Sequence, residues 1–260
     1  MRTYRAPTST ADLVAALAAA TDPILIAGGQ SLLPSLREKR IRSGELIDIG
    51  RVASLKDIVL DDGGATIGAG VVMADLAKGQ IAKRLPMLAC AAGWVGNHVV
   101  RGRSTLGGSL AWANPRAEMP TVMMALDAII TTQHRSFPAR QLMTGAFTTI
   151  LERGEAILSV RVPDSPRMVF DEVIPRNSTG RAVVAIACAD VGNGDVSVTL
   201  AGLTDIPIFD YVLKQGQPFT DSSISEAIRG HAPSAHFTSL EYRIAAARVL
   251  ANRCRDRLQD

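Results

Sequence analysis

Ala27-Gly28-Gly29-Gln30-Ser31-Leu32-Leu33-Pro34 is the first of two glycine-rich stretches in this chain, and it directly follows the apolar run Pro23-Ile24-Leu25-Ile26. The second is Thr105-Leu106-Gly107-Gly108-Ser109-Leu110-Ala111. Paired glycines allow the backbone to adopt positive φ angles and to approach a ligand closely. Successive N–H groups in such turns form a nest for an anion, and the hydroxyls of Ser31 and Ser109 add further donors. Two loops of this kind suit the pyrophosphate of a dinucleotide.

Each glycine pair taken alone is weak evidence, because paired glycines also occur in ordinary turns. Gly63-Gly64, for example, lies between two apolar runs and is typical of a plain hairpin turn. The stretch Gly68-x-Gly70-x-x-Met73 lacks the third glycine of the Rossmann fingerprint. No Gly-x-x-x-x-Gly-Lys-Ser/Thr motif occurs, so the sequence does not indicate a P-loop NTPase.

The composition is that of a folded protein with a sizeable hydrophobic core. The chain has 260 residues, 47% of them hydrophobic and 20% charged, so we expect one large domain or two ordinary ones. The net charge of +3 is too small to indicate a nucleic-acid-binding surface. Near the end of the chain, arginines at helical spacing predict a solvated or partner-facing helix face: Arg248, Arg253, Arg255 and Arg257.

The cysteines of the sequence do not form a metal-binding pattern. Cys90, Cys188 and Cys254 are far apart, and none belongs to a Cys-x-x-Cys pair. We therefore expect neither a zinc site nor an iron–sulfur cluster within this chain, and the sparse cysteines fit reduced thiols in the cytosol. No apolar run has the length of a membrane span and no segment is typical of a cleavable signal peptide, so we expect a cytoplasmic protein.

Apolar periodicity and turn residues predict a mixed α+β chain. Ser9-Thr10-Ala11-Asp12 is typical of a helix N-terminus, and the helix is expected to reach about residue 20. Apolar runs at 58–60 and 65–69 flank Asp61-Asp62-Gly63-Gly64 and predict a β-hairpin. Further helices are expected at 73–82, 86–96, 121–126 and 239–258. Further strands are expected at 23–27, 45–49, 128–133, 156–162, 182–191 and 196–203.

A domain boundary is expected at Pro163-Asp164-Ser165-Pro166, which is proline-rich and polar. It would separate a first α+β part of residues 1–163 from a smaller α+β tail of residues 164–260.

Taken together, the motifs resemble one family. The chain is similar to the FAD-binding, or medium, subunits of the molybdenum hydroxylases, the group of xanthine dehydrogenase and carbon monoxide dehydrogenase. The resemblance spans nearly the whole chain and rests on four stretches. These are residues 27–34, Arg101 with residues 105–111 and 115–120, residues 145–149 with 155–163, and residues 239–243.

The resemblance implies a fold and a set of cofactor contacts. The fold is α+β, a two-subdomain FAD-binding fold of the vanillyl-alcohol-oxidase (PCMH) type, with subdomains at about 1–55 and 56–163 and a small C-terminal domain. Glu118 corresponds to the family's flavin-contacting acid, and Asn114 stands where many members carry aspartate. Ile157, with Leu158, would pack against the isoalloxazine ring, a role compatible with that of buried strand residues. The pyrophosphate would be held by Ala27, Gly28, Gly29, Gln30, Ser31, Leu32, Leu33, Thr105, Gly107, Gly108 and Ser109.

The resemblance also implies a function as an oxidoreductase subunit that transfers electrons through FAD. In the family, a large subunit holds the molybdopterin cofactor and a small subunit holds 2Fe–2S clusters, from which electrons pass through FAD to an external acceptor. The expected assembly is a dimer of heterotrimers. Two alternatives remain open from the sequence: a self-contained flavin oxidase or reductase of the same fold, and a structural scaffold that has lost its flavin.

Overall fold

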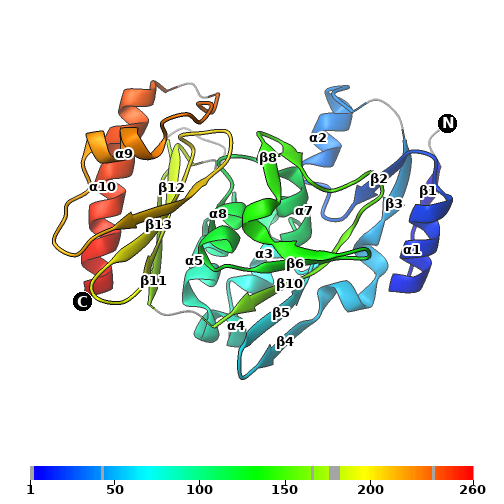
Figure 1. Ribbon diagram of the computed structural model, residues 1–260. Coiled ribbons are helices and arrows are strands. Elements are labelled where there is room, and N and C mark those ends of the chain that lie inside the picture. Colours follow the sequence, from blue (N-terminus) through cyan, green and yellow to red (C-terminus); the bar gives the residue numbers. More distant parts are fainter. Residues whose placement is uncertain (1–2, 42–43, 165–166, 176–181, 236–237, 260) are drawn as a thin grey trace.

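The computed structural model describes residues 3–41, 44–164, 167–175, 182–235 and 238–259. Three groups of elements lie side by side in sequence order (Figure 1). A small parallel sheet lies near the N-terminus, a five-stranded sheet with short helices forms the middle, and a four-stranded sheet with the C-terminal helix forms the other end. The class is α+β, as the sequence predicts.

The first group is a three-stranded parallel sheet with one flanking helix. Its strand order is β1 (Tyr4–Arg5), β3 (Glu45–Asp48), β2 (Pro23–Ile26). Helix α1 (Thr10–Ala19) begins where the sequence predicts, because the hydroxyl of Ser9 accepts a hydrogen bond from the N–H of Asp12 at 3.0 Å. The first glycine loop connects β2 to the short helix α2 (Leu32–Arg37).

The second group is an antiparallel sheet with short helices. Its strand order is β4 (Ile58–Asp61), β5 (Gly64–Gly68), β10 (Ile157–Pro163), β6 (Ile129–Thr132) and β7 (Ser136–Pro138). The predicted hairpin is β4 with β5. A separate ladder joins β8 (Met143–Gly145) to β9 (Thr148–Thr149). The helices are α3 (Met73–Leu76), α4 (Gly79–Arg84), α5 (Pro86–Trp94), α6 (His98–Arg101), α7 (Leu106–Trp112) and α8 (Glu118–Ala125), with 3₁₀ turns η1 (Ile49–Arg51), η2 (Ala53–Lys56) and η3 (Ala139–Gln141).

Two helix predictions need correction. The single helix predicted at 73–82 is two helices, α3 and α4, because the backbone is extended at Lys78, between the end of α3 at Leu76 and the start of α4 at Gly79, which has a left-handed φ of +70°. The helix predicted at 121–126 begins earlier, at Glu118. Pro120 is compatible with that earlier start, since a proline in the first turn removes an N–H that would have no helical partner.

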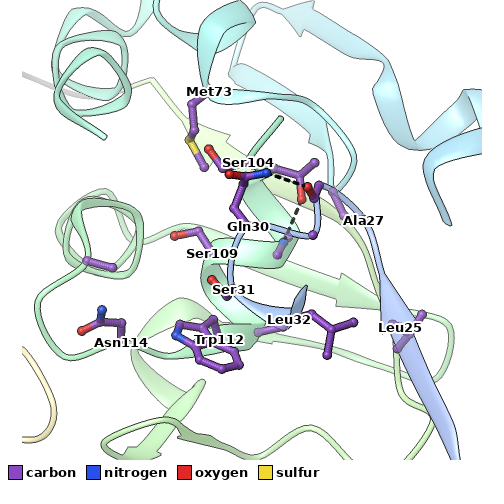
Figure 2. A pocket seen from close by; sticks show the side chains of 18 of the residues that line it. Leu25, Ala27, Gln30, Ser31, Leu32, Met73, Ser104, Ser109, Trp112 and Asn114 are labelled. Carbon is purple, nitrogen blue, oxygen red and sulfur yellow. Dashed lines mark hydrogen bonds between the residues drawn. The ribbon is translucent and has the colours of Figure 1, made fainter. Parts of the chain in front are cut away.

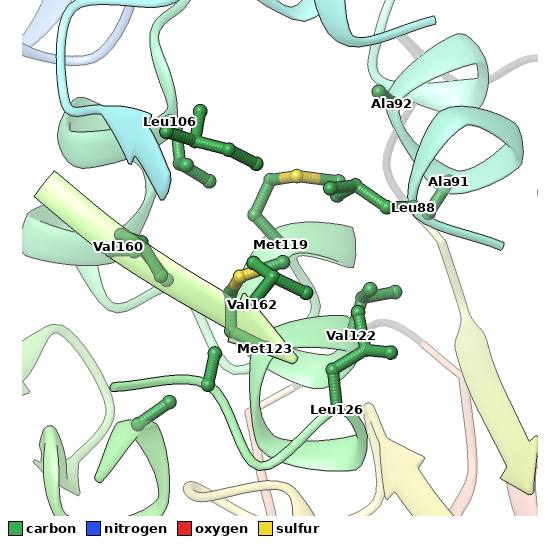
Figure 3. Close-up of a cluster of buried hydrophobic side chains, with 14 of the residues drawn as sticks. Leu88, Ala91, Ala92, Leu106, Met119, Val122, Met123, Leu126, Val160 and Val162 are labelled. Carbon is green, nitrogen blue, oxygen red and sulfur yellow. The ribbon is translucent and has the colours of Figure 1, made fainter. Parts of the chain in front are cut away.

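A methionine-rich core holds α7 and α8 in place (Figure 3). Met119 and Met123 of α8 are fully buried together with Leu106 of α7, Leu88 of α5 and Val160 of β10. Burying each such side chain contributes about 1.5–3 kcal/mol. Because α7 contains the second glycine pair and α8 begins with a buried acid, this core fixes the position of both.

The third group is an antiparallel sheet covered by the C-terminal helix. Its strand order is β11 (Met168–Val173), β12 (Val184–Asp190), β13 (Val196–Ala201) and β14 (Ile208–Leu213). Helices α9 (Asp221–Ala227) and α10 (Leu240–Gln259) complete it, and Cys188 and Cys254 are buried between sheet and α10. The prediction of neighbouring strands at 182–191 and 196–203 is confirmed, as is that of the long C-terminal helix.

Gly202, which directly follows β13, connects the third group to the second. Its N–H donates to the carbonyl of Pro115 at 3.1 Å. Its own carbonyl accepts hydrogen bonds from Nη1 of the buried Arg243 at 2.6 Å and from the hydroxyl of Ser234 at 2.8 Å.

On β11, the carboxyl group of Glu172 is buried with no hydrogen-bond partner among the described residues. Burial raises its pKa to about 9, so it is neutral at pH 7.

The arginines of α10 form ion pairs inside the chain. Arg253 reaches Asp171 of β11 at 3.2 Å, and Arg248 reaches Asp221 of α9 at 2.8 Å. The predicted solvated or partner-facing arginine face is therefore in part a contact with the chain's own sheet. None of the helices in the described part of the chain, α10 included, is long and apolar enough to cross a membrane.

Candidate functional site

Both glycine loops line one cavity of about 540 Å³ (Figure 2). The lining includes most residues that the sequence singles out: Ala27, Gly28, Gly29, Gln30, Ser31, Leu32, Thr105, Gly107, Gly108, Ser109, Asn114, Glu118 and Ile157. Two others lie elsewhere. Leu33 is 45% exposed, and Leu158 packs with the core beneath α1.

The two loops approach each other so closely that only glycine fits at the contact. A Cβ atom on Gly28 would lie 1.8 Å from the carbonyl oxygen of Arg103, two residues before the second glycine stretch. A Cβ on Gly107 would lie 2.6 Å from the Cβ of Ala69. These glycines are therefore required to bring the walls of the cavity together, apart from any contact with a ligand.

The first loop forms an open nest of backbone donors. Within the described chain, the N–H groups of residues 28–32 donate to no backbone carbonyl, and all five residues line the cavity. The positive φ of +72° at Gly29 produces the turn, and the side-chain amide of Gln30 donates to the carbonyl of Gly28 at 3.1 Å. Unpaired N–H groups facing a cavity are suited to a phosphate oxygen.

The second glycine stretch, predicted as a loop, is the start of helix α7 with Thr105 as its N-cap, so it contributes differently from the prediction. Its backbone donors are already used: the N–H of Gly107 donates to Ala69 at 2.8 Å, and that of Gly108 to the hydroxyl of Thr105 at 3.2 Å. What this loop offers a ligand is close approach and the hydroxyl of Ser109. The hydroxyl of Ser104, directly before this stretch, is buried at the cavity without a partner among the described residues.

Glu118 is a buried acid in the wall of the cavity. It is the first residue of α8 and is 6% exposed. Burial raises its pKa to about 7, although a hydrogen bond from its own backbone N–H acts in the opposite direction. Nearby, the side-chain oxygen of Asn114 accepts a hydrogen bond from the N–H of Arg116 at 3.0 Å and shapes the turn that leads to α8. An acid so placed can accept a hydrogen bond from a ligand hydroxyl.

Comparison with known proteins decides the family. Residues 1–165 match the family described as "FAD binding domain in molybdopterin dehydrogenase". The chain belongs to this family. The resemblance seen in the sequence is therefore confirmed, and the match contains all the lining residues of the cavity.

Individual relatives agree with this assignment. The chain is 40% identical over 164 residues to the 6-hydroxypseudooxynicotine dehydrogenase complex subunit alpha of Paenarthrobacter nicotinovorans, a match that covers 60% of this chain and 55% of that one. It thus spans little more than half the length of that relative. It is 30% identical over 245 residues to the glyceraldehyde dehydrogenase medium chain of Sulfolobus acidocaldarius, covering 86% of each. A chain of quinoline 2-oxidoreductase from Pseudomonas putida 86 superposes with a TM-score of 0.88 and 29% identity, covering 100% of this chain and 97% of that one.

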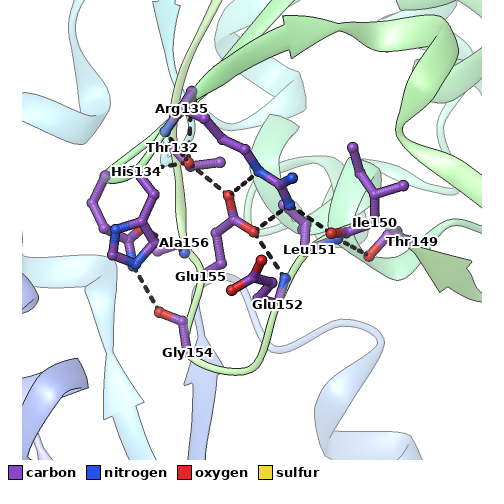
Figure 4. Close-up of polar contacts among 11 residues, drawn as sticks. Thr132, His134, Arg135, Thr149, Ile150, Leu151, Glu152, Gly154, Glu155 and Ala156 are labelled. Atoms are coloured by element: carbon purple, nitrogen blue, oxygen red, sulfur yellow. Dashed lines mark hydrogen bonds and ion pairs between the residues drawn. The ribbon is translucent and has the colours of Figure 1, made fainter.

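The FAD-binding domain also contains a polar network that anchors the start of β10 (Figure 4). Glu155 accepts two hydrogen bonds from Arg135, at 2.9 and 2.8 Å, one from the hydroxyl of Thr132 at 2.8 Å and one from the N–H of Glu152 at 2.8 Å. The hydrogen bonds from Arg135 are the largest reason that the pKa of Glu155 is lowered to about 2. The network holds the segment that leads directly into Ile157.

No sequence motif marks the aromatic and sulfur-containing residues that line the cavity, Trp112 and Met73. Trp112 lies three residues after Ser109, and Met73 begins α3. The spacing of Trp112 was a usable signal, because residues three apart on a helix share a face. Nothing local marks Met73, whose place in the cavity depends on the packing of α3.

For the full chain without FAD, we expect Glu118→Gln to change how stability depends on pH. The folded pKa of about 7 lies above the unfolded value of about 4.5. The folded state therefore binds more protons between these values, and wild-type stability falls as pH rises from about 4.5 to 7. The variant lacks this fall, which amounts to at most about 3 kcal/mol. Urea unfolding at pH 5 and pH 8 measures the difference.

The exposed Glu152, replaced by glutamine, is the control for this experiment and should leave the pH dependence unchanged. The charge of Glu118 contributes to the raised pKa of Glu172, so part of the difference between wild type and Glu118→Gln is expected to arise through Glu172. Parallel pH profiles for wild type and Glu118→Gln would show that Glu118 is hydrated in the folded chain.

Proposed function

We propose that this chain is the FAD-binding electron-transfer subunit of a molybdenum hydroxylase. In this proposal, electrons from 2Fe–2S clusters of a partner subunit pass through FAD to an external acceptor. The observation that supports it most directly is the open nest of N–H groups at residues 28–32, within a cavity that the second glycine loop closes. This cavity lies entirely within the part of the chain that matches the FAD-binding family.

The residues of the cavity fit FAD. The nest and the hydroxyls of Ser31 and Ser109 would bind the pyrophosphate, and the carboxyl of Glu118 would accept hydrogen bonds from hydroxyls of the cofactor. Ile157 would pack against the isoalloxazine ring; Leu158, predicted for the same role, packs with a different core. FAD supplies the redox chemistry, while the protein binds and orients it and sets its electrostatic environment. No side chain of this chain needs to act on the organic substrate.

The proposal includes partners and organisation. Relatives are named as a complex subunit and as a medium chain, which supports assembly with further subunits. We propose a large molybdopterin-binding subunit and a small 2Fe–2S subunit, arranged as a dimer of heterotrimers in the cytoplasm. Within this chain we propose a PCMH-type FAD-binding domain at 1–163, with subdomains at about 1–55 and 56–163, and a C-terminal domain at 164–260.

The test is to purify the chain from its native source with whatever subunits accompany it. The absorption spectrum, the identity of the released cofactor and the metal content would then be measured. Flavin absorbance, released FAD, molybdenum and iron in one complex are the expected result. A colourless complex without FAD would favour the scaffold alternative. FAD in an isolated chain that turns over a small substrate would favour a self-contained oxidase or reductase.

A further inference from the structure

Among the described residues that line the cavity, Trp112 is the one aromatic side chain. It is the last residue of α7 and is partly buried. Figure 2 shows its indole beside Asn114, Ser31 and Leu32, so it lies next to the first glycine loop as well as at the end of the second. A flat apolar ring in this position offers a surface against which another flat ring can pack.

A second aromatic ring supports the indole from the side. Phe147, in the turn between β8 and β9, meets Trp112 edge to face, with 5.8 Å between ring centroids and 70° between ring planes. The N–H of Phe147 donates to the carbonyl of Ala113 at 2.8 Å. Both Ala113, at φ +48°, and Phe147, at φ +57°, lie in the left-handed region that side chains rarely adopt. The unusual backbone therefore places one ring against the other.

We infer that the indole of Trp112 packs against the isoalloxazine ring of FAD and that Phe147 holds the indole in place. This inference rests on the proposed function and extends it to a residue that neither the glycine motifs nor the family match assigns. Trp112 would be a positioning residue for the flavin that also provides an electron-rich neighbour.

Two observations favour the isoalloxazine over the adenine ring. First, α7 packs against β10, and β10 begins with Ile157, the residue proposed to contact the isoalloxazine. Second, the ring that exchanges electrons with other proteins must lie near the surface, and this end of the cavity does so. Phe147 is 54% exposed and Trp112 is partly exposed. The adenine ring has no such requirement.

The contact has a spectroscopic signature. An indole in contact with an electronically excited isoalloxazine donates one electron to it, and the electron returns to the indole, so that no net reaction occurs and the fluorescence of the flavin is quenched. An indole that contacts only the adenine ring leaves flavin emission unchanged. The chain contains two tryptophans, and the other, Trp94, is exposed and does not line the cavity.

The experiment uses the full chain without partner subunits, loaded with FAD. Bound FAD per chain is measured first, and flavin emission per bound FAD second. We expect Trp112→Phe and Trp112→Leu to raise emission several-fold and the control Trp94→Phe to leave it unchanged. Phe147→Leu should give a smaller rise in flavin emission and more heterogeneous fluorescence lifetimes, because the indole of Trp112 loses the ring that packs against its side.

Equal emission per bound FAD in wild type and Trp112→Phe would overturn the inference. Trp112→Phe keeps a flat ring in the cavity, so the comparison stands even if Trp112→Leu fails to retain FAD. Failure of the wild-type chain to bind FAD is detected in the first measurement and would overturn the proposed function, and the inference with it. The two failures are therefore distinguished.

Discussion

Gly28→Ala is expected to remove FAD from the protein. A Cβ atom at this position would lie 1.8 Å from the carbonyl oxygen of Arg103, so the first glycine loop must move away from the second. The obstacle is backbone, which cannot rotate aside as a flexible side chain can. Because the proposed pyrophosphate site requires both loops, we expect affinity for FAD to fall at least about 100-fold, or about 2.8 kcal/mol. Titration of the cofactor-free chain with FAD measures the loss.

Gly93→Ala is the matched control. Gly93 lies near the end of α5, is exposed, and has no atom within 4 Å of the position its Cβ would take. Alanine also has a higher helix propensity than glycine. This variant should therefore bind FAD like the wild type and be equally or slightly more stable. Stoichiometric FAD in purified Gly28→Ala would show that the loops can separate without loss of the site.

Glu155→Ala is expected to destabilise the folded chain by about 2–3 kcal/mol at pH 7. The carboxylate is 1% exposed, and its removal leaves the N–H of Glu152 without its acceptor. The hydroxyl of Thr132 loses its shorter hydrogen bond and keeps only the carbonyl of Arg135, at 3.2 Å, as an acceptor. Arg135 is 40% exposed, so water screens part of its attraction and replaces part of its hydrogen bonding. Chemical unfolding of both proteins measures the difference.

The ion pair between Glu155 and Arg135 also predicts how the stability of the folded chain depends on pH. The pKa of Glu155 is lowered to about 2 in the folded state, below its unfolded value of about 4.5. The stabilisation is therefore complete above about pH 4.5 and is lost as pH falls toward 2. The advantage of wild type over Glu155→Gln should shrink across that window. Asp61→Asn, which breaks the exposed pair with Arg161, is the control and should have a much smaller effect.

Much of the fold was predictable because local patterns and tertiary structure agree. The β4–β5 hairpin, the Ser9 cap of α1 and the strands of the third group follow from residues adjacent in sequence. The break between α3 and α4 was missed because glycine is tolerated within helices, and only the extended backbone of Lys78 and the positive φ of Gly79 show that α4 is a separate helix. Local pattern does not distinguish these two uses of glycine.

The sequence was enough to predict that the two glycine stretches line the site, but not which of the neighbouring groups face the cavity. Both loops line the cavity as predicted, yet the occupied N–H of Gly107 depends on contact with Ala69, a distant segment that no motif reveals. Leu33 and Leu158 belong to motif stretches but face elsewhere. Neighbours on the helix α2 point in directions about 100° apart, and neighbours on the strand β10 point to opposite faces. Cofactor roles for the lining residues remain predictions that the variants above test.

Gly202 joins the C-terminal helix α10 to the wall of the proposed FAD cavity. One hydrogen bond ties its N–H to Pro115, in the turn between Asn114 and Glu118, and another ties its carbonyl to Arg243 on α10. The third group also packs directly on α8, the helix that begins with the cavity-lining Glu118, so a neighbour docked on α10 would contact a unit that extends to the wall of the cavity. Any such linkage is reciprocal, so loading the cavity would also alter how readily α10 accepts a neighbour. The C-terminal helix and the wall of the cavity are thus joined through one glycine, which hydrogen-bonds to Arg243 on α10 and to Pro115 beside the cavity-lining Asn114.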